Sequence, residues 1–191
     1  MKKIHDFDEV FDGQKVFRIV LEGMSNPGRV LSIKEQAQKM YGENPAFLAL
    51  AMTLLDNEVS FFTCGNQKIS EDISLLTLAK ETAVEDADYI FVEKEEDLKN
   101  VLEKAKIGTL ADPQQSATIL VKTGTDFGSN LAIYGAGVDQ TMQLTVPEVV
   151  KTALRLRDEQ VYEYPQGVDF IFVTEDERIL CIPRLVLREG K

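Results

Sequence analysis

The sequence predicts a single α/β domain over residues 1–191, with three α/β/α layers built around a mixed β-sheet. Segments with apolar residues at helical spacing alternate along the chain with short apolar runs that are typical of strands. One such run, at residues 89–92, is apolar throughout, as expected for a strand covered on both faces. Two pairs of strand-like runs in the second half are joined by turn-forming residues, which predicts antiparallel hairpins and therefore a mixed sheet.

The first helix is predicted over residues 12–24, with an apolar face formed by Phe17, Val20, Leu21 and Met24. Residues 25–28 end this helix, because proline cannot continue it and glycine supplies a turn. The next helix begins with Asn44 as N-cap and Pro45 in the first helical position. The apolar run at 46–55 is too short to span a membrane, so it predicts a helix buried between layers.

The remaining elements follow from the same patterns. Further helices are predicted over residues 70–80, over 95–106, and from the capping box Thr145-x-x-Glu148 onward. Strands are predicted over residues 29–33, 59–63, 89–92, 117–121, 130–134, 168–173 and 179–182. The turn-rich segment 123–128 predicts one hairpin, and the acidic turn 175–177 predicts another between the last two strands.

The charge balance excludes several classes of partner. Lys and Arg number 21 and Asp and Glu 32, so the formal net charge is −11. Such a chain is a poor nucleic-acid binder, because phosphate affinity needs a surplus of Lys and Arg. No stretch approaches the roughly 20 apolar residues of a membrane span. Lys2 and Lys3 are followed by acidic residues rather than by an apolar signal region, so we expect a cytoplasmic protein that contacts neither nucleic acid nor membrane.

Cysteine and histidine are too scarce for several kinds of site. Cys64 and Cys181 form no disulfide framework and lie in apolar runs, where they are expected as small buried thiols. His5 is the only histidine, which argues against a His-rich zinc site and against Ser-His-Asp or Cys-His catalysis. We therefore predict no metal site and no catalytic residue.

Three motifs carry weak chemical signals. Gly135-x-Gly137 follows a strand and could bring backbone N–H groups close to a phosphate, or it could form a tight turn between strand and helix. Lys122 ends a strand and could form a Schiff base with pyridoxal phosphate, or it could be an ordinary edge lysine. The carboxylate clusters at 93–97 and 175–177 lack the spacing of a calcium loop, which favours a solvated helix start and a solvated turn.

Arginine side chains offer the best candidates for contacts with a ligand or partner. Arg184 follows Pro183 at the end of the last strand, and Asp169 begins a buried strand, where its charge needs a partner. An Arg184–Asp169 pair across the hairpin is therefore predicted, either as an internal ion pair or as a ligand or partner contact. Arg18 lies beside Phe17, off the predicted apolar face of the first helix.

The ordered motifs of the chain resemble those of one family. They are Phe17-Arg18-x-x-Leu21-x-x-Met24-Ser25-x-Pro27-Gly28, Ala51-x-Thr53-Leu54-Leu55-Asp56-Asn57, Gly108-Thr109-x-x-x-Pro113-x-x-x-Ala117-Thr118, Gly135-Ala136-Gly137-Val138, Tyr164-Pro165-x-Gly167-Val168-Asp169 and Ile182-Pro183-Arg184. Together they resemble PhnH, a subunit of the bacterial carbon–phosphorus lyase system. Each motif is weak alone, but six in the right order cover nearly the whole chain.

The resemblance implies a fold similar to a reduced large domain of pyridoxal-phosphate-dependent transferases, without the cofactor. It also implies a homodimer that joins the PhnG, PhnI and PhnJ subunits in a core complex. That complex transfers an alkylphosphonate to the ribose C1 of ATP, and the chain would be a noncatalytic, accessory subunit. Two alternatives stay open: a nucleotide or phosphonate pocket near Gly135 and Gly137, with Arg18 or Arg184 gripping the anion, and a relic pyridoxal-phosphate enzyme. The candidate interface or ligand residues are Arg18, Ser25, Pro27, Gly28, Gly135, Gly137, Asp169, Pro183 and Arg184.

Overall fold

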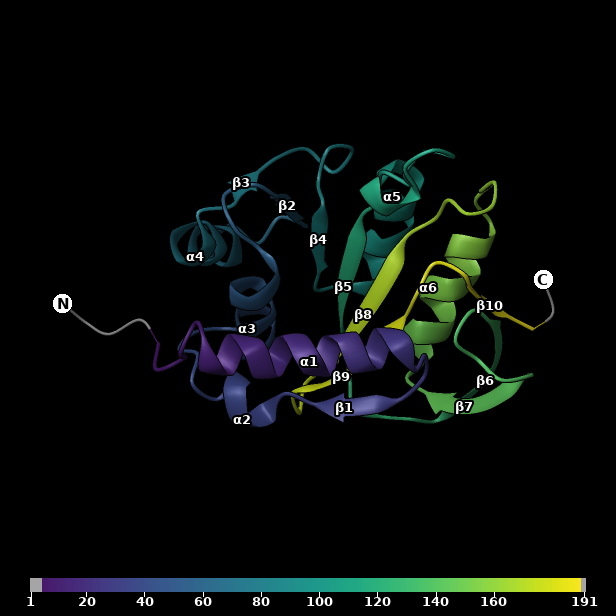
Figure 1. Ribbon diagram of the computed structural model, residues 1–191, viewed down its shortest axis with the longest axis horizontal. Coiled ribbons are helices and arrows are strands. Elements are labelled where there is room, and N and C mark those ends of the chain that lie inside the picture. Colours follow the sequence, from purple (N-terminus) through teal and green to yellow (C-terminus); the bar gives the residue numbers. More distant parts are fainter. Residues whose placement is uncertain (1–4, 190–191) are drawn as a thin grey trace.

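Two β-sheets and six α-helices make up the computed structural model, which describes residues 5–189, so that Lys2 and Lys3 lie outside the described residues (Figure 1). The larger sheet has seven strands, in the order β1 (Val30–Ser32), β9 (Arg178–Ile182), β8 (Asp169–Thr174), β5 (Thr118–Thr123), β4 (Tyr89–Val92), β2 (Ser60–Thr63) and β3 (Lys80–Glu81). The smaller sheet has the order β10 (Val186–Arg188), β6 (Ser129–Gly135) and β7 (Met142–Val146).

The larger sheet is mixed, as predicted. Strands β3, β2, β4, β5 and β8 run parallel to one another, whereas β9 pairs antiparallel with β8 and β1 pairs antiparallel with β9. The β8–β9 hairpin confirms the prediction made from the acidic turn at 175–177. Thr174 closes this turn, because its hydroxyl accepts a hydrogen bond from the backbone N–H of Arg178.

Helices cover both faces of the larger sheet. One face packs against α1 (Phe11–Ser25), α2 (Lys34–Ala37), α3 (Pro45–Leu54) and α4 (Gln67–Thr77). The other face packs against α5 (Leu98–Lys104), α6 (Glu148–Asp158) and the smaller sheet. Side chains alternate accordingly, since Phe170 and Phe172 of β8 lie in one core and Ile171 and Val173 lie in the other. Short 3-10 helices, η1 (Glu95–Asp97) and η2 (Pro113–Gln115), precede α5 and β5.

The predicted hairpin across residues 123–128 is wrong. Strand β5 lies between β4 and β8, both parallel to it, so neither of its edges is free for β6. Strand β6 instead pairs antiparallel with β7 and β10 in the smaller sheet. The Gly135–Gly137 turn therefore joins two strands rather than a strand and a helix. Strands β7 and β10 were not predicted from the sequence, because both are short and partly polar.

Two predicted helix starts differ from the structure. Thr145 belongs to β7, where it pairs with Asn130, so the capping box does not form and α6 begins at Glu148. Pro45 does open α3, but Asn44 is in the left-handed conformation and its side chain caps no backbone N–H. The Asn44 amide instead donates a 2.5 Å hydrogen bond to Glu93 at the end of β4.

The buried face of α1 is rotated from the predicted one. Val16, Val20 and Gly23 are buried, whereas Phe17 and Leu21 are 51% and 55% exposed. Gly23 explains the rotation, because an added Cβ at that position would lie 2.8 Å from the Sγ atom of Cys181 on β9. A helix can approach a sheet this closely only along a face without bulky side chains. The larger apolar residues of α1 consequently point outward.

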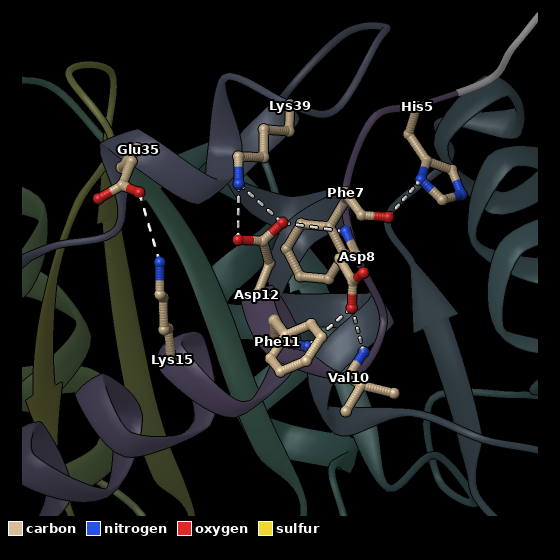
Figure 2. A network of polar contacts seen from close by, with 9 residues as sticks. All are labelled: His5, Phe7, Asp8, Val10, Phe11, Asp12, Lys15, Glu35 and Lys39. Atoms are coloured by element: carbon tan, nitrogen blue, oxygen red, sulfur yellow. Dashed lines mark hydrogen bonds and ion pairs between the residues drawn. The ribbon is translucent and has the colours of Figure 1, made fainter.

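A polar network fixes the N-terminal end of α1 (Figure 2). The carboxylate of Asp8 accepts hydrogen bonds from the backbone N–H groups of Val10 and Phe11. Asp12, only 2% exposed, accepts hydrogen bonds from the backbone of Asp8 and from Lys39, whose Nζ lies 2.7 and 2.9 Å from its two carboxylate oxygens. Burial alone would raise the pKa of Asp12, but the Lys39 and Asp8 contacts outweigh it and lower that pKa. The network joins α1 to the segment that follows α2.

Candidate functional site

Two cavities meet at Arg184, where the end of β9 lies near α6 and the β6–β7 turn. The first, of about 430 Å³, we call the Arg157 cavity; it is lined by Gly135, Arg157, Tyr162, Tyr164, Arg184 and Leu185, among others. The second, of about 470 Å³, we call the Ser25 cavity; it is lined by Ser25, Gly137, Asp169, Pro183, Arg184 and Leu185, among others. Segments far apart in the sequence thus converge on one region.

Arg184 forms the predicted ion pair with Asp169. Its Nη2 lies 2.9 Å from one oxygen of Asp169, and its backbone N–H donates a 2.8 Å hydrogen bond to the other. Its Nη1 also donates to the carbonyl oxygen of Pro113 in the loop before β5. Both charged side chains are less than one-fifth exposed. Arg184 therefore holds the start of β8, the end of β9 and the 108–116 loop together.

The glycines of the β6–β7 turn allow the chain segments to approach closely. Gly135 has a φ of 118°, and an added Cβ would lie 2.3 Å from the carbonyl oxygen of Leu185. Gly137 has a φ of 79°, and an added Cβ would lie 3.1 Å from the Cδ atom of Pro27, in the turn after α1. Only glycine fits such a combination of positive φ and contact. This turn therefore packs against both α1 and the 183–186 segment.

A buried arginine borders the Arg157 cavity. Arg157 is 2% exposed and is the largest fully buried side chain among the described residues. Its Nη2 donates a 2.6 Å hydrogen bond to the carbonyl oxygen of Val186, and its guanidinium lies 5.9 Å from the ring centroid of Phe170. Asp158 is 3.8 Å away, but its other carboxylate oxygen accepts a closer bond, 2.6 Å, from Arg188. Burial lowers the pKa of Arg157.

Tyr162 contributes a buried hydroxyl to the same cavity. Among the described residues, that hydroxyl has no hydrogen-bond partner. Burial raises the pKa of Tyr162 to about 12, although the nearby charge of Arg157 acts in the opposite direction. A buried polar atom without a partner is costly, and most such atoms in native proteins contact protein or an ordered ligand or water.

Most of the predicted site residues gather around these two cavities. Ser25, Gly135, Gly137, Asp169, Pro183 and Arg184 line one or both of them. Pro27 lies against Gly137, and the backbone N–H of Gly28 donates to the carbonyl oxygen of Cys181. Pro27 and Gly28 line neither cavity but contact this region, whereas Arg18 is exposed on α1 and also lines neither cavity.

Arg157, Tyr162 and Arg188 were not among the site residues predicted from the sequence. A signal for Arg157 was present, since positions 150, 153, 154 and 157 share one face of a helix and the first three are apolar. A charged residue on such a face is buried and needs a partner. Tyr162 and Arg188 carried no comparable signal, because Tyr162 follows α6, whose end was not predicted, and Arg188 lies in β10, a strand that was not predicted.

Lys122 lies elsewhere, at the carboxyl edge of the parallel strands. It lines a cavity of about 280 Å³ together with the first residues of α3 and with Glu175 and Glu177. Glu93 accepts hydrogen bonds from Asn44 and Asn66, so it joins the starts of α3 and α4. Within residues 5–189, no group of three or more His, Cys, Asp or Glu side chains is placed to hold a metal ion.

The two cysteines are free thiols in apolar surroundings. Cys181 is buried on β9, and Cys64 is partly buried after β2. Burial raises the pKa of each thiol to about 12, which disfavours the reactive thiolate.

None of the helices described here is long and apolar enough to cross a membrane.

Comparison with known proteins confirms the resemblance predicted from the motifs. The family model described as "Bacterial phosphonate metabolism protein (PhnH)" matches residues 5–187. The chain is also similar to the alpha-D-ribose 1-methylphosphonate 5-triphosphate synthase subunit PhnH of Rhizobium meliloti (strain 1021). The two are 25% identical over 182 residues, which cover 93% of this chain and 90% of the relative. Both cavities lie within the matched span, and the chain belongs to the PhnH family of bacterial phosphonate metabolism proteins.

Proposed function

We propose that this chain is an accessory, noncatalytic subunit of the carbon–phosphorus lyase core complex. In that role it supports the transfer of an alkylphosphonate to the ribose C1 of ATP, and it acts in the cytoplasm as a single domain. The observation that carries the proposal is the match of a PhnH model to residues 5–187, together with a relative that is named as a subunit of the triphosphate synthase. The proposed partners are a second copy of the chain and the PhnG, PhnI and PhnJ subunits.

The exposed side of α1 supports a docking role. Four exposed apolar side chains lie on α1 or directly before it, and we call them the α1 strip: Val10 and Phe11, each 71% exposed, Phe17, 51% exposed, and Leu21, 55% exposed. Contiguous apolar residues on a surface mark interaction sites more often than isolated ones do. We assign the α1 strip to the contact with the neighbouring subunits, and Arg18 lies on the same helix, where a partner's carboxylate could reach it.

The proposal includes no cofactor. We propose that the fold is related to the large domain of pyridoxal-phosphate-dependent transferases, and that Lys122 does not form a Schiff base. Two carboxylates, Glu175 and Glu177, line the same 280 Å³ cavity as Lys122 and would repel the phosphate of such a cofactor. A purified protein that absorbs visible light would contradict this part of the proposal.

Co-expression with the other core subunits of its own operon tests the proposal. A tag on this chain should recover PhnG, PhnI and PhnJ in stoichiometric amounts, and recovery of the soluble chain alone would refute the subunit role. A Phe17→Glu/Leu21→Glu variant should keep its thermal stability but lose its partners. Leu75→Glu is the matched control, because Leu75 is 64% exposed on α4, away from the α1 strip. If the α1 variant still assembles, the subunit role stands and the α1 assignment is wrong.

A second candidate function is the binding of a nucleotide or phosphonate near Gly135 and Gly137. The observation that favours it is the Arg157 cavity, which places arginine side chains next to the β6–β7 turn. The arginine best placed to bind the anion is neither of the two expected from the sequence. Arg18 lies on α1, and Arg184 already binds Asp169 and Pro113, which leaves Arg157 as the better ligand contact.

A further inference from the structure

The Arg157 cavity has the properties of a preformed ligand-binding site. It combines a buried cation, a buried hydroxyl with no partner in the described chain, and apolar walls. We propose that it binds a small organic anion through Arg157 and Tyr162. The apolar or aromatic body of that ligand lies against Tyr164, Leu185 and Leu187. This inference rests on the second candidate function and specifies its ligand class.

Arg157 has donors to spare for an anion. A guanidinium carries five N–H donors. Within residues 5–189, its hydrogen bonds go to the carbonyl oxygens of Val186, at 2.6 Å, and Pro183, at 3.5 Å. No carboxylate binds it closely, because Asp158 lies 3.8 Å away and makes its shorter contact with Arg188. An oxygen of a bound phosphonate, phosphate or carboxylate would supply the missing charge-assisted bonds.

The charge of the region limits the charge of the ligand. Three arginines lie in or beside the cavity, Arg157, Arg184 and Arg188, against two aspartates, Asp158 and Asp169. One positive charge is therefore in excess, on a chain whose formal net charge is −11. Such a site can neutralise a carboxylate, or most of the charge of a phosphonate or phosphate, which is about one to two negative charges near neutral pH, but it cannot neutralise a triphosphate. We infer a ligand with one phosphonate, phosphate or carboxylate group rather than a nucleoside triphosphate.

Tyr162 gives the site its second polar contact. Its hydroxyl is buried without a partner in the described chain, and it lines the same cavity as Arg157. A phenol donates one hydrogen bond, which an anionic oxygen bound at Arg157 would accept. The hydroxyl thus costs stability in the free protein and contributes affinity in the complex, a pattern found where a site is organised for a ligand.

The walls determine the rest of the ligand. Leu185, Leu187 and Tyr164 present apolar surface, and the volume of about 430 Å³ lies in the range of small-molecule sites. Tyr164 is 82% exposed, so it stands at the mouth, where a flat group could stack on its ring. An arylphosphonate fits this combination better than methylphosphonate, which would leave the apolar walls unused.

Calorimetric titration with phenylphosphonate tests the inference directly. The wild-type chain should bind phenylphosphonate more tightly than methylphosphonate and more tightly than ATP. Tyr162→Phe should weaken phenylphosphonate binding by about tenfold to a hundredfold, the range expected for a lost bond to a charged group. The same variant without ligand should unfold at an equal or higher temperature, because it lacks the unsatisfied hydroxyl. Tyr134→Phe is the control, because Tyr134 lies on β6 and is not part of the cavity lining.

Each outcome decides a different point. If Tyr162→Phe binds phenylphosphonate as tightly as the wild type, or lowers the melting temperature of the free protein, the role assigned to the hydroxyl is wrong. If ATP binds and phenylphosphonate does not, the ligand class is wrong while the second candidate function survives. If neither binds, both are wrong, and the pull-down result still decides the accessory-subunit proposal by itself.

Discussion

Loss of the Asp169 carboxylate should destabilise the chain through Arg184. In Asp169→Ala, the guanidinium of Arg184 keeps its hydrogen bond to the carbonyl oxygen of Pro113 but loses its ion pair. The backbone N–H of Arg184 also loses its acceptor, the Asp169 oxygen at 2.8 Å. Each hydrogen bond to a charged group contributes about 1.5–3 kcal/mol, and removal of one partner of a fully buried pair costs about 3–5 kcal/mol. Because both side chains keep some exposure, 19% and 16%, we expect a loss of about 2–3 kcal/mol.

Urea unfolding followed by circular dichroism measures this loss. For a chain of this length, about 2–3 kcal/mol corresponds to a fall in melting temperature of roughly 4–12 °C. Asp169→Asn should cost less, because its amide oxygen can still accept from the Arg184 backbone. Arg155→Met is the matched control: it breaks an ion pair with Glu159 in which both side chains are about half exposed, and it should change stability by less than about 0.5 kcal/mol. Equal effects of Asp169→Ala and Arg155→Met would refute the reasoning.

Three further predictions follow from single positions. Gly135→Ala should destabilise the chain by about 2 kcal/mol or more, because the new Cβ would meet the Leu185 carbonyl oxygen at a positive φ. Gly124→Ala is the control and should be tolerated, because the space around Gly124 is open. Equal melting temperatures of the two variants would contradict this prediction. The folded state lowers the pKa of Asp12, so the ionised carboxylate stabilises the fold above the ordinary aspartate pKa, and this stabilisation is lost as the pH falls through the lowered pKa. The difference in unfolding free energy between the wild type and Asp12→Asn should therefore shrink in acid. A difference that stays constant with pH would disprove this role of Asp12. Cys181 should resist a thiol reagent at neutral pH until urea unfolds the chain, since burial raises its pKa to about 12; rapid labelling of the native Cys64→Ser variant would show otherwise.

The sequence was a good guide wherever a pattern repeats locally. The uninterrupted apolar runs predicted the central strands, among them β4 at Tyr89–Val92, helical spacing predicted α1 and α6, and Pro45 followed by an apolar run predicted α3. The polar turn between two apolar runs was enough for the β8–β9 hairpin, since a short connection leaves antiparallel pairing as the simplest arrangement. Even the Arg184–Asp169 pair followed from the sequence, because a charge at the start of a buried strand needs a partner.

The sequence was a poor guide wherever the choice of neighbour is not local. The turn at 123–128 was compatible with a hairpin, but β5 is paired with β4 and β8, so β6 joins another sheet. On α1, helical spacing offered a face with Phe17 and Leu21, but the close approach of Gly23 to Cys181 selected an adjacent face, rotated around the helix, that includes Val16 and Val20. Both decisions depend on contacts between residues far apart in the chain, which a local pattern does not contain.

The same distinction holds for the candidate site. By itself, the sequence determined the net charge of −11, the turn glycines, the ion pair and the family to which the chain is similar. Only the tertiary structure decided that Ser25 and Arg184 line one cavity, that Arg18 stands apart from it, and that Arg157 and Tyr162 border another. The physical reason is that a site is made of distances between segments remote in sequence, and these distances are set when the sheet, helices and turns pack together.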